Sequence, residues 1–508
     1  MNLLMQAANE VGAANHRVTD LRSALRLLED TPGQLLRTDV EVDPVAELAG
    51  VYRRVGAGTP VAPPTKLGPA MLFQNVKGYP GARVVTGVMA SRERVGLLLD
   101  TPPERLGFRL LEAVKQRIEP VLTAGRVPPC QEVVHLAPLD VRKLLPAPTN
   151  TPLDAGPYFT MGLLRATDPE TGEHDVTIHR LCVQGPDTIS VFFAPSRHID
   201  AFRAKAEAVD APLPVSISIG LDPAVYIAAC FEAPTTPQGL DELSIAGALR
   251  RTPVELARCR TVDQNCIANA EVVIEGQILP HVRVAEDRNT HTGHAMPEFP
   301  GYNGPANPEV CLMRVTAVTH RGNPILQTIV GPGEEHVNLA GIPTEASILH
   351  MVGLSMPGRL LNCYAHSAGG GKLVAVLQFR KAAASDEGRQ RQAALLALAA
   401  YHELKHVILV DDDVDIFNTN DVLWAMTTRF QGNISTIFIP GVTGHVLDLS
   451  QSPDFSGSLI QQGTTCKTIF DCTVPYPLKR RFERARFMEI EDAKLESFLT
   501  PSGKPLEL

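Results

Sequence analysis

The middle of the chain is a succession of short segments rich in β-branched and aromatic residues, separated by turn-forming stretches such as residues 145–157. Only two segments there have helical character, residues 199–208 and a piece near 226–230. Many strands with few helices indicate a barrel-like β core. The predicted strands cover residues 158–165, 176–183, 188–193, 215–219, 271–278 and 312–318.

The region before this core mixes helical and strand patterns. Its first helix places Val18, Leu21, Leu25 and Leu28 at helical spacing, and Thr19 or Asp20 can cap it. Further helices are predicted over residues 46–55 and 104–117, and strands over 70–76 and 83–89. We therefore expect a small α/β domain over residues 1–125, followed by the barrel over residues 126–330.

Past the core, the pattern changes to alternating helices and strands, which is typical of an α/β layer domain. A long amphipathic helix is predicted over residues 386–404, followed by a strand over 406–410 and a helix over 421–429. A charged helix is predicted over 480–498. The expected fold class is thus mixed α+β and α/β, with a C-terminal α/β domain over residues 331–508 that ends in a terminal helix and an oligomerisation tail.

Composition narrows the function classes. The 508 residues include 47 basic and 56 acidic side chains, a net charge of −9 that argues against a nucleic-acid surface. The nine cysteines form no C-x-x-C pair, which indicates reduced buried thiols and a cytoplasmic location. No apolar run approaches 18 residues and the N-terminus lacks a signal pattern, so we expect a soluble protein with no membrane contact.

Two stretches carry residues suited to chemistry. Residues 286–302, E-D-R-N-T-H-T-G-H-A-M-P-E-F-P-G-Y, combine acids, two histidines and a turn too rich in Pro and Gly for a helix. Residues 175–180, D-V-T-I-H-R, bring an acid, a histidine and an arginine, and S-R-H follows at 196–198. Two acids and a buried arginine can together hold a carboxylate and deliver a proton.

Several common motifs are absent or incomplete. The run H-S-A-G-G-G-K at 366–372 lacks the first glycine of a phosphate loop, and Leu373 stands where Ser or Thr would bind magnesium. No G-x-S-x-G occurs, and the aspartates of 411–415 fit turn formers or caps. A better metal candidate is the set Asp175, His198 and Glu242, whose oxygens and single imidazole suit Mn²⁺ or Mg²⁺ more than Zn²⁺.

These motifs, taken in order, resemble the UbiD-type decarboxylases, which use prenylated FMN. The resemblance runs from about Leu21 to Arg484 and rests on D-V-T-I-H-R, S-R-H-I, G-L-D-P-A, D-E-L-S-I-A-G-A-L, P-E-F-P-G-Y, K-H-V-I-L-V-D-D-D-V-D-I-F and D-V-L-W-A-M-T-T-R. Within that family the chain is most similar to the 3,4-dihydroxybenzoate (protocatechuate) decarboxylase branch. It shares N-T-P-L-D-A-G-P-Y-F, C-F-E-A-P-T-T-P and G-P-G-E-E-H with that branch.

The resemblance implies a site for prenylated FMN and ions in the barrel domain. It implies that Mn²⁺, or Mg²⁺, bridges the cofactor phosphate to the protein, with K⁺ nearby. The implied cofactor residues are Asp175, Thr177, Ile178, Arg180, Arg197, His198 and Glu242, and the implied metal ligands are Asp175, His198 and Glu242. Many members have Asn where Asp175 stands, so this chain carries an additional negative charge there.

The implied catalytic set is Glu286, Arg180 and Glu298. Other branches place the two glutamates five residues apart in P-E-G-P-F-G-E, whereas here twelve positions separate them. This departure makes the assignment of Glu286 less direct than that of Glu298. His336, in G-P-G-E-E-H, is the candidate that contacts a phenol of the substrate, because an imidazole can share or remove a proton near neutral pH.

The implied reaction is reversible, non-oxidative decarboxylation of a hydroxylated aromatic acid through a covalent substrate–prenylated-flavin adduct. The expected substrate is 3,4-dihydroxybenzoate, giving catechol and CO₂; gallate, 4-hydroxybenzoate and vanillate remain alternatives. A plain FMN reductase or a non-catalytic flavin-carrier subunit would not need both residue sets. The expected partners are a small aromatic carboxylate, a flavin prenyltransferase that supplies cofactor, and further copies of the chain in a homodimer or a higher homo-oligomer such as a hexamer.

Overall fold

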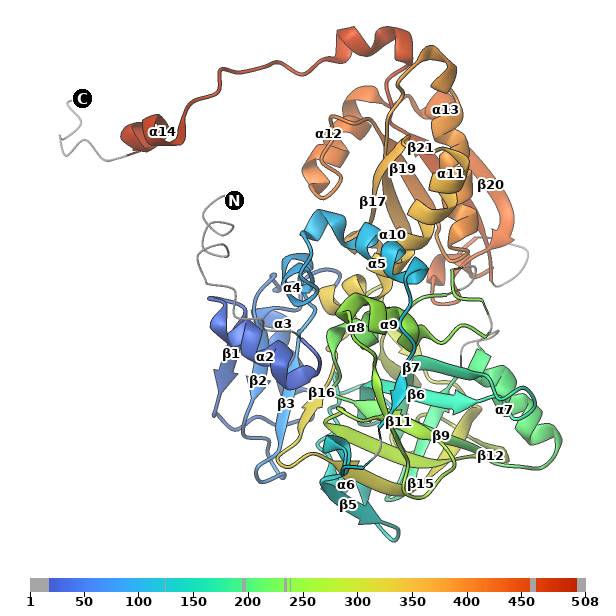
Figure 1. Cartoon of the computed structure of the whole chain (residues 1–508). Helices are drawn as coiled ribbons and strands as arrows, with labels where there is room; N and C mark the ends of the chain where they lie inside the picture. The colour runs from blue at the N-terminus through green and yellow to red at the C-terminus, as the bar shows by residue number, and fades with distance from the viewer. Residues whose placement is uncertain are drawn as a thin grey trace.

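The computed structural model describes residues 18–123, 125–193, 198–232, 235–237, 239–456 and 463–499. Figure 1 shows an N-terminal α/β unit beside a β-barrel, with a second α/β unit stacked above them and a C-terminal arm that leaves the body of the molecule. The mixed α/β fold class with a central barrel is as predicted. Arg197 and residues 1–17 lie outside the described residues.

The N-terminal unit is a four-stranded sheet in the order β1 (Leu35–Thr38), β2 (Ala70–Phe73), β3 (Arg83–Thr86), β16 (Ile325–Gln327). The last of these strands comes from far along the chain and pairs in parallel with β3. Helix α2 (Leu21–Asp30) begins at the N-cap Asp20, whose side chain accepts a hydrogen bond from the Ser23 amide, and its leucines are buried as the spacing predicted. The other helices here are α3 (Glu47–Val55), α4 (Arg92–Leu98) and α5 (Leu106–Lys115).

The barrel closes because β12 pairs with both β9 and β15. Its strands run β12-β9-β6-β7-β8-β15, every neighbouring pair is antiparallel, and β5 (Val133–Leu136) extends the sheet beyond β15. Closure leaves no free edge among these six strands. Their bounds are β6 (Tyr158–Thr167), β7 (His174–Val183), β8 (Thr188–Phe192), β9 (Leu213–Ile219), β12 (Val272–Val284) and β15 (Val310–His320).

Smaller elements surround the barrel. The helices are α6 (Val141–Leu144), α7 (His198–Ala208), α8 (Pro223–Ala228) and α9 (Glu242–Arg250). A three-stranded sheet is formed by β11 (Asn265–Ile267), β10 (Glu255–Arg258) and β4 (Val121–Leu122). The hairpin of β13 (His294–Pro297) and β14 (Asn303–Pro305) carries the P-E-F-P-G-Y turn between its strands.

The C-terminal unit is a five-stranded sheet in the order β17-β18-β19-β21-β20, with apolar clusters on both faces. Helices α10 (Gly333–Ser355) and α11 (Arg389–Ala400) pack against one face, and α12 (Thr419–Arg429) against the other. The strands are β17 (Leu360–Ala365), β18 (Val374–Phe379), β19 (His406–Val410), β20 (Thr436–Thr443) and β21 (Thr464–Asp471), and the short helix α13 (Gly432–Ser435) precedes β20.

Two predicted C-terminal helices differ from the structure. The helix predicted over 386–404 spans only Arg389–Ala400. The single helix predicted over 480–498 is wrong: a 3₁₀ turn (Tyr476–Phe482) is followed by an extended segment, and only α14 (Asp492–Leu499) is helical. Figure 1 shows α14 away from the body, so no packed apolar face supports a longer helix there. No helix among the described residues is long and apolar enough to cross a membrane.

Candidate active site

A cavity of about 690 Å³ lies between the barrel and the C-terminal unit. Strand β7 supplies one wall, with Asp175–Arg180 all in contact with the space. The β13–β14 hairpin supplies Glu298, and the start of α10 supplies His336. Two C-terminal segments close the remaining side, so residues far apart in sequence share one enclosed volume. Such a concave site with a few convergent polar groups is typical of a cofactor or substrate pocket.

Arg180 lies at the centre of the predicted catalytic set. Its guanidinium stacks over the Phe192 ring, 4.3 Å from the centroid, and forms ion pairs with Glu286 and Glu298. The Arg180 Nη2 to Glu286 Oε2 distance is 2.8 Å. The twelve-residue separation of the two glutamates is therefore compatible with both side chains reaching one arginine.

The two glutamates have different surroundings. Glu286 is 1 % exposed and also accepts hydrogen bonds from the Tyr158 hydroxyl (3.0 Å) and the Asn307 amide (3.1 Å). Three donors, Arg180 among them, hold this carboxylate in place. Glu298 borders the cavity and pairs with Arg180; burial raises the pKa of Glu298, while Arg180 opposes that shift. The arrangement thus offers an anchoring carboxylate and a second acid that retains its proton more readily.

The turn after β13 explains the position of Glu298. The Glu298 amide donates to the Tyr302 carbonyl (2.8 Å), and the Gly301 amide donates to the Glu298 carbonyl (2.9 Å). Gly301 has φ +95°, which a side chain would strain. The prolines and glycine of P-E-F-P-G-Y therefore form a tight loop that directs the acid toward Arg180.

The predicted metal ligands lie at the other end of β7. His198 Nδ1 is 3.4 Å from Asp175 Oδ1, and Glu242 is the first residue of α9, whose N-cap is Asp241. Glu242 Oε2 is buried with no hydrogen-bond partner among the described residues. Burial and the neighbouring Asp175 raise the pKa of Glu242. A bound cation would give the buried Glu242 oxygen a partner and would offset the repulsion between Glu242 and Asp175. These side chains therefore fit a hard divalent ion.

The fit does not amount to a preformed metal centre. Within the part of the chain that the structure describes, no group of three or more His, Cys, Asp or Glu side chains is arranged to hold a metal ion. Thr177 and Ile178 line the same wall, and Thr177 Oγ1 donates to Asp175 Oδ2 (3.3 Å). The ion therefore stays a prediction.

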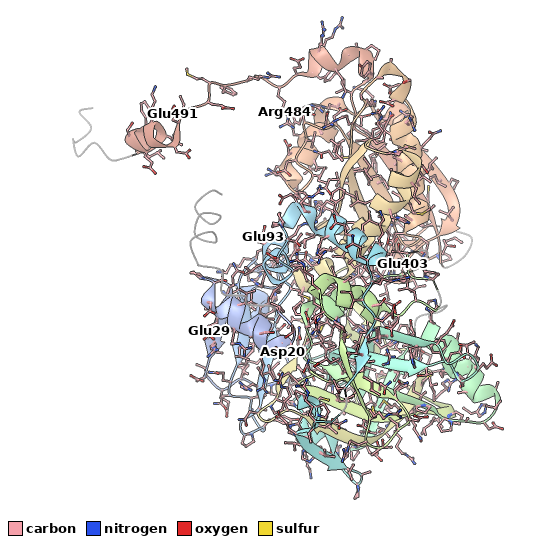
Figure 2. The ribbon with its side chains drawn as sticks, viewed as in Figure 1. Asp20, Glu29, Glu93, Glu403, Arg484 and Glu491 are labelled. Atoms are coloured by element: carbon pink, nitrogen blue, oxygen red, sulfur yellow. The ribbon has the colours of Figure 1, made fainter. Side chains whose placement is uncertain are left out.

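Sequence reasoning missed a second polar cluster on the C-terminal wall. Lys372 Nζ contacts Glu403 Oε2 (2.8 Å), which also accepts from the Tyr401 hydroxyl (2.6 Å) and lies 3.3 Å from His445 Nε2. Burial alone would raise the pKa of Glu403, but Lys372 and His445 hold it below its ordinary value. Figure 2 shows Glu403 where the C-terminal unit meets the rest of the molecule. Lys372 ends the run H-S-A-G-G-G-K, and Glu403 belongs to H-E-L-K-H at 402–406, which matches H-E-x-x-H but is not helical. Only the tertiary fold brings these residues together at the cavity.

His336 faces the same cavity. Its ring is 6.0 Å from that of Phe299 in an edge-on arrangement. Desolvation, with a smaller effect of Lys372, lowers the pKa of His336 to about 4. The imidazole is thus neutral at pH 7 and can accept a hydrogen bond, but its lowered pKa makes it a weak base.

The glycine run before Lys372 has a packing role. A Cβ on Gly370 would lie 2.4 Å from a Phe299 ring carbon, and one on Gly371 would lie 2.5 Å from the Val337 carbonyl oxygen. Both glycines have positive φ. They allow the backbone to approach the β13–β14 turn and α10 closely, which brings Lys372 to the cavity.

Comparison with known proteins places this chain among the carboxy-lyases. Three family models match the chain, the N-terminal, Rift-related and C-terminal domains of 3-octaprenyl-4-hydroxybenzoate carboxy-lyase, at residues 26–114, 123–334 and 337–472. The chain belongs to the UbiD family of decarboxylases. The sequence-based family assignment and the prediction of an enzyme are therefore confirmed.

Individual relatives match nearly the whole chain. Gallate decarboxylase of Lactiplantibacillus plantarum is 50% identical over 478 residues, covering 93% of this chain and 98% of that protein. The apo 3,4-dihydroxybenzoic acid decarboxylase of Enterobacter cloacae is 58% identical with a TM-score of 0.92, covering 95% and 100%. An evolved dimeric form of HmfF from Pelotomaculum thermopropionicum, solved with prFMN, is 34% identical with a TM-score of 0.80, covering 94% and 99%.

Proposed function

We propose that the chain catalyses the reversible, non-oxidative decarboxylation of 3,4-dihydroxybenzoate to catechol and CO₂. The observation that carries this proposal is the pairing of Arg180 with one fully enclosed and one cavity-facing glutamate, opposite a wall bearing His336 and Lys372. A flavin reductase would not need two acids paired with one arginine. A flavin carrier would not need the second polar wall, which carries His336 and Lys372. The reported activities of the similar proteins favour the same reaction class.

Prenylated FMN is the proposed cofactor, supplied by a flavin prenyltransferase. When bound, it provides the electrophile and electron sink that no side chain offers. Asp175, His198 and Glu242 would hold Mn²⁺ or Mg²⁺ against its phosphate, with K⁺ nearby. The unpartnered, buried Glu242 oxygen among the described residues supports the ion, and the prFMN-bound relative supports the flavin.

Glu298 is the proposed proton donor to the ring carbon that loses its carboxylate. It borders the cavity, and its raised pKa favours the protonated acid. Arg180 cannot serve because a guanidinium keeps its charge in proteins. Instead it anchors Glu286 and positions Glu298, an arrangement in which two acids with different surroundings have separate roles.

The opposite wall would recognise the hydroxyl groups. Neutral His336 can accept a hydrogen bond from the para hydroxyl, and sharing that proton makes the carboxylated carbon more nucleophilic. Lys372, held by Glu403 at the cavity, can donate to a neighbouring hydroxyl oxygen. A ring lacking one hydroxyl would leave part of this polar wall unsatisfied, which is costly in an enclosed site.

Gallate is the second candidate, because the gallate decarboxylase of L. plantarum is half identical to this chain. Protein produced together with a flavin prenyltransferase should be assayed for CO₂ release on 3,4-dihydroxybenzoate, gallate, 4-hydroxybenzoate and vanillate. We expect the highest kcat/KM on 3,4-dihydroxybenzoate. A higher kcat/KM on gallate would make gallate the substrate in place of 3,4-dihydroxybenzoate. If flavin-loaded protein released CO₂ from none of the four acids, the proposal would be contradicted.

His336 provides an internal check on substrate recognition. His336→Ala should lose at least about tenfold in kcat/KM on 3,4-dihydroxybenzoate, since it leaves the substrate hydroxyl without its acceptor, at a cost of about 1–3 kcal/mol, while flavin content stays at the parent level. His291→Ala is a matched control, because His291 is exposed and does not line the cavity. Equal kcat/KM for His336→Ala and the parent would leave His336 only a structural role.

A further inference from the structure

Two histidines meet at the edge of the barrel sheet, outside the cavity. His135 lies in β5 and His320 is the last residue of β15. The two strands are antiparallel, with His135 opposite Val318 and His320 opposite Val133. Residues two positions apart along a strand share a face of the sheet, so the two imidazoles are diagonal neighbours on one face. Neither histidine lines the cavity of the candidate active site.

The two rings approach each other through the same atom. His135 Nε2 and His320 Nε2 are 3.1 Å apart, the ring centroids are 5.2 Å apart, and the ring planes differ by 24°. The two nitrogens therefore lie between the ring centres and face each other. Both residues are partly exposed, and β5 is the end strand of its sheet, so solvent reaches this pair.

The far nitrogen of His320 is fixed by the backbone. His320 Nδ1 lies 2.8 Å from the Arg321 carbonyl oxygen, and because a carbonyl oxygen only accepts, Nδ1 carries the hydrogen. In the neutral ring, Nε2 then has a free lone pair that points at His135. A histidine that binds a metal through one nitrogen commonly donates the other N–H to a backbone carbonyl in this way.

His135 can supply a second lone pair. In the hydrogen-bonded pair its Nε2–H is the donor to His320 Nε2. Among the described residues the His135 ring makes no other hydrogen bond, so its proton can move to Nδ1 and leave Nε2 bare. Burial, and after it the neighbouring His320, lowers the pKa of His135, which favours the neutral ring that a metal requires.

We propose that His135 and His320 form a Zn²⁺ site in which both Nε2 atoms bind the ion and water fills the other positions. At a Zn–N distance of about 2.0–2.1 Å, two nitrogens on a tetrahedral ion lie about 3.3 Å apart. The observed separation of 3.1 Å is close to that value, so a small tilt of the rings aims both lone pairs at one ion. Water is needed because no group of three or more His, Cys, Asp or Glu side chains is arranged for a metal within the described residues.

The donor set selects the kind of ion. Imidazole nitrogen suits Zn²⁺, Cu²⁺ and Ni²⁺, whereas Mn²⁺ and Mg²⁺ prefer oxygen ligands. The pair is thus chemically distinct from the oxygen-rich set of Asp175, His198 and Glu242. An ion here would also link two strands: β5 pairs only with β15 in this sheet, so Zn²⁺ should slow the local opening of the end strand.

The test uses the full chain, with any affinity tag removed, stripped of metal with a chelator and titrated with ZnCl₂ by calorimetry. We expect the parent to bind one Zn²⁺ more than the double variant His135→Ala with His320→Ala. Each single variant should weaken binding at this site at least about tenfold, since outer-shell partners alone are worth that much. An ion at Asp175, His198 and Glu242 would bind to every variant, so the difference counts the new site alone.

Hydrogen exchange gives a second readout, which a hydrogen-bonded histidine pair without a metal would not produce. Adding Zn²⁺ should slow amide exchange over residues 133–136 in the parent and not in the double variant. His291→Ala is the control, because His291 is exposed elsewhere and should leave the stoichiometry unchanged. Equal Zn²⁺ stoichiometry in the parent and the double variant would overturn the proposal and leave a hydrogen-bonded pair only. If the alanine variants do not fold, unchanged exchange of residues 133–136 in the Zn²⁺-treated parent would overturn it as well.

Discussion

Glu286 and Glu298 share one arginine but differ in what else reaches them. Tyr158 and the Asn307 amide donate to Glu286, whereas Glu298 borders the cavity. A carboxyl that gives up a proton during turnover must recover it from solvent or product. Of the two, only Glu298 is placed to meet a bound ring, so the difference between anchor and donor is set by individual side-chain contacts.

Glu298→Gln tests this assignment directly. Glutamine keeps the shape but has no acidic proton, so we expect a loss in kcat of at least about a hundredfold, the usual contribution of general acid catalysis. Flavin content should not change, and the variant should not exchange the ring proton of catechol in deuterated water. Glu309→Gln, at an exposed position, is the control. Proton exchange at the parent rate would show that another group delivers the proton.

At the scale of elements, α9 connects the barrel to the proposed ion. Asp241 caps the helix by accepting from the Leu243 amide (2.9 Å), and Arg165 lies 3.3 Å from the same aspartate. Glu242 follows immediately and is thereby held near Asp175. The cap residue is thus expected to orient the ligand through the helix start.

Glu242→Gln should therefore lower metal and flavin content more than it lowers stability, because the ligand acts through the ion. Metal analysis and flavin absorbance after desalting give the occupancy, and thermal unfolding of the apo protein gives the stability. Glu112→Gln, exposed on α5, should change neither. Full metal and flavin occupancy in Glu242→Gln would remove Glu242 from the ligand set.

Helix α10 carries a buried acid with a pH signature. Glu335 accepts from the Gly87 (2.7 Å) and Met89 (3.0 Å) amides, and burial raises the pKa of Glu335 from 4.5 to about 7. Between these values the folded chain keeps a proton that the unfolded chain releases. The contribution of Glu335 to stability therefore falls as pH rises from about 4.5 to about 7.

Glu335→Gln should flatten this dependence. Chemical denaturation of the apo protein at pH 5, 6, 7 and 8 would give the free energy of unfolding at each pH. We expect the free energy of unfolding of the parent to fall relative to that of the variant as the pH rises. This trend does not depend on the constant difference in stability that comes from exchanging a carboxylate for an amide. Parallel curves for the two proteins would show that Glu335 does not titrate between pH 5 and 8.

At the scale of the whole molecule, the C-terminal arm is the least covered part. Phe487 is 90 % exposed and Phe498 72 %. Arg484 forms an ion pair with Asp421 (2.8 Å) and stacks on Trp424, so the arm is fixed at its root, whereas Glu491 lies at the start of α14 away from the body (Figure 2). Large apolar side chains in such an arm favour burial against another copy of the chain.

Removing residues 486–508 should therefore reduce the oligomer mass measured by light scattering, while far-UV circular dichroism of the body stays intact. The matched variant is Phe487→Ser with Phe498→Ser in the full chain, which keeps the length but removes the apolar contacts. We expect the same direction of change in both. An unaltered mass in the truncated protein would mean that self-association, if present, uses other surfaces.

Local signals predicted the barrel strands and the first helix well, because their burial patterns are regular along the sequence. The hydrogen-bonded cap at Asp20 and the continuous apolar run of β6 are examples. Helix α10 was missed because it is buried on most sides and contains Pro343, so it lacks an amphipathic stripe. The arm was predicted as one helix because charge pattern alone does not show whether an apolar face finds a partner.

The residues of the candidate site likewise fall into those that the sequence predicted and those that it did not. Arg180, Glu298, Asp175 and Glu242 lie in contiguous motifs that the sequence displays. The cluster of Lys372, Tyr401, Glu403 and His445 joins segments from different loops, and no spacing rule connects them. Such contacts depend on how two folded units meet, which the linear order does not encode.

The cavity has a barrel wall that carries Arg180 and Glu298 and a C-terminal wall that carries Lys372 and Glu403. In the proposed function, proton delivery and recognition of ring substituents therefore reside on different stretches of one polypeptide. Recombination between family members at the start of α10 would exchange one wall and leave the other intact. An enzyme lineage could in this way change the range of aromatic acids that it accepts without altering its reaction chemistry.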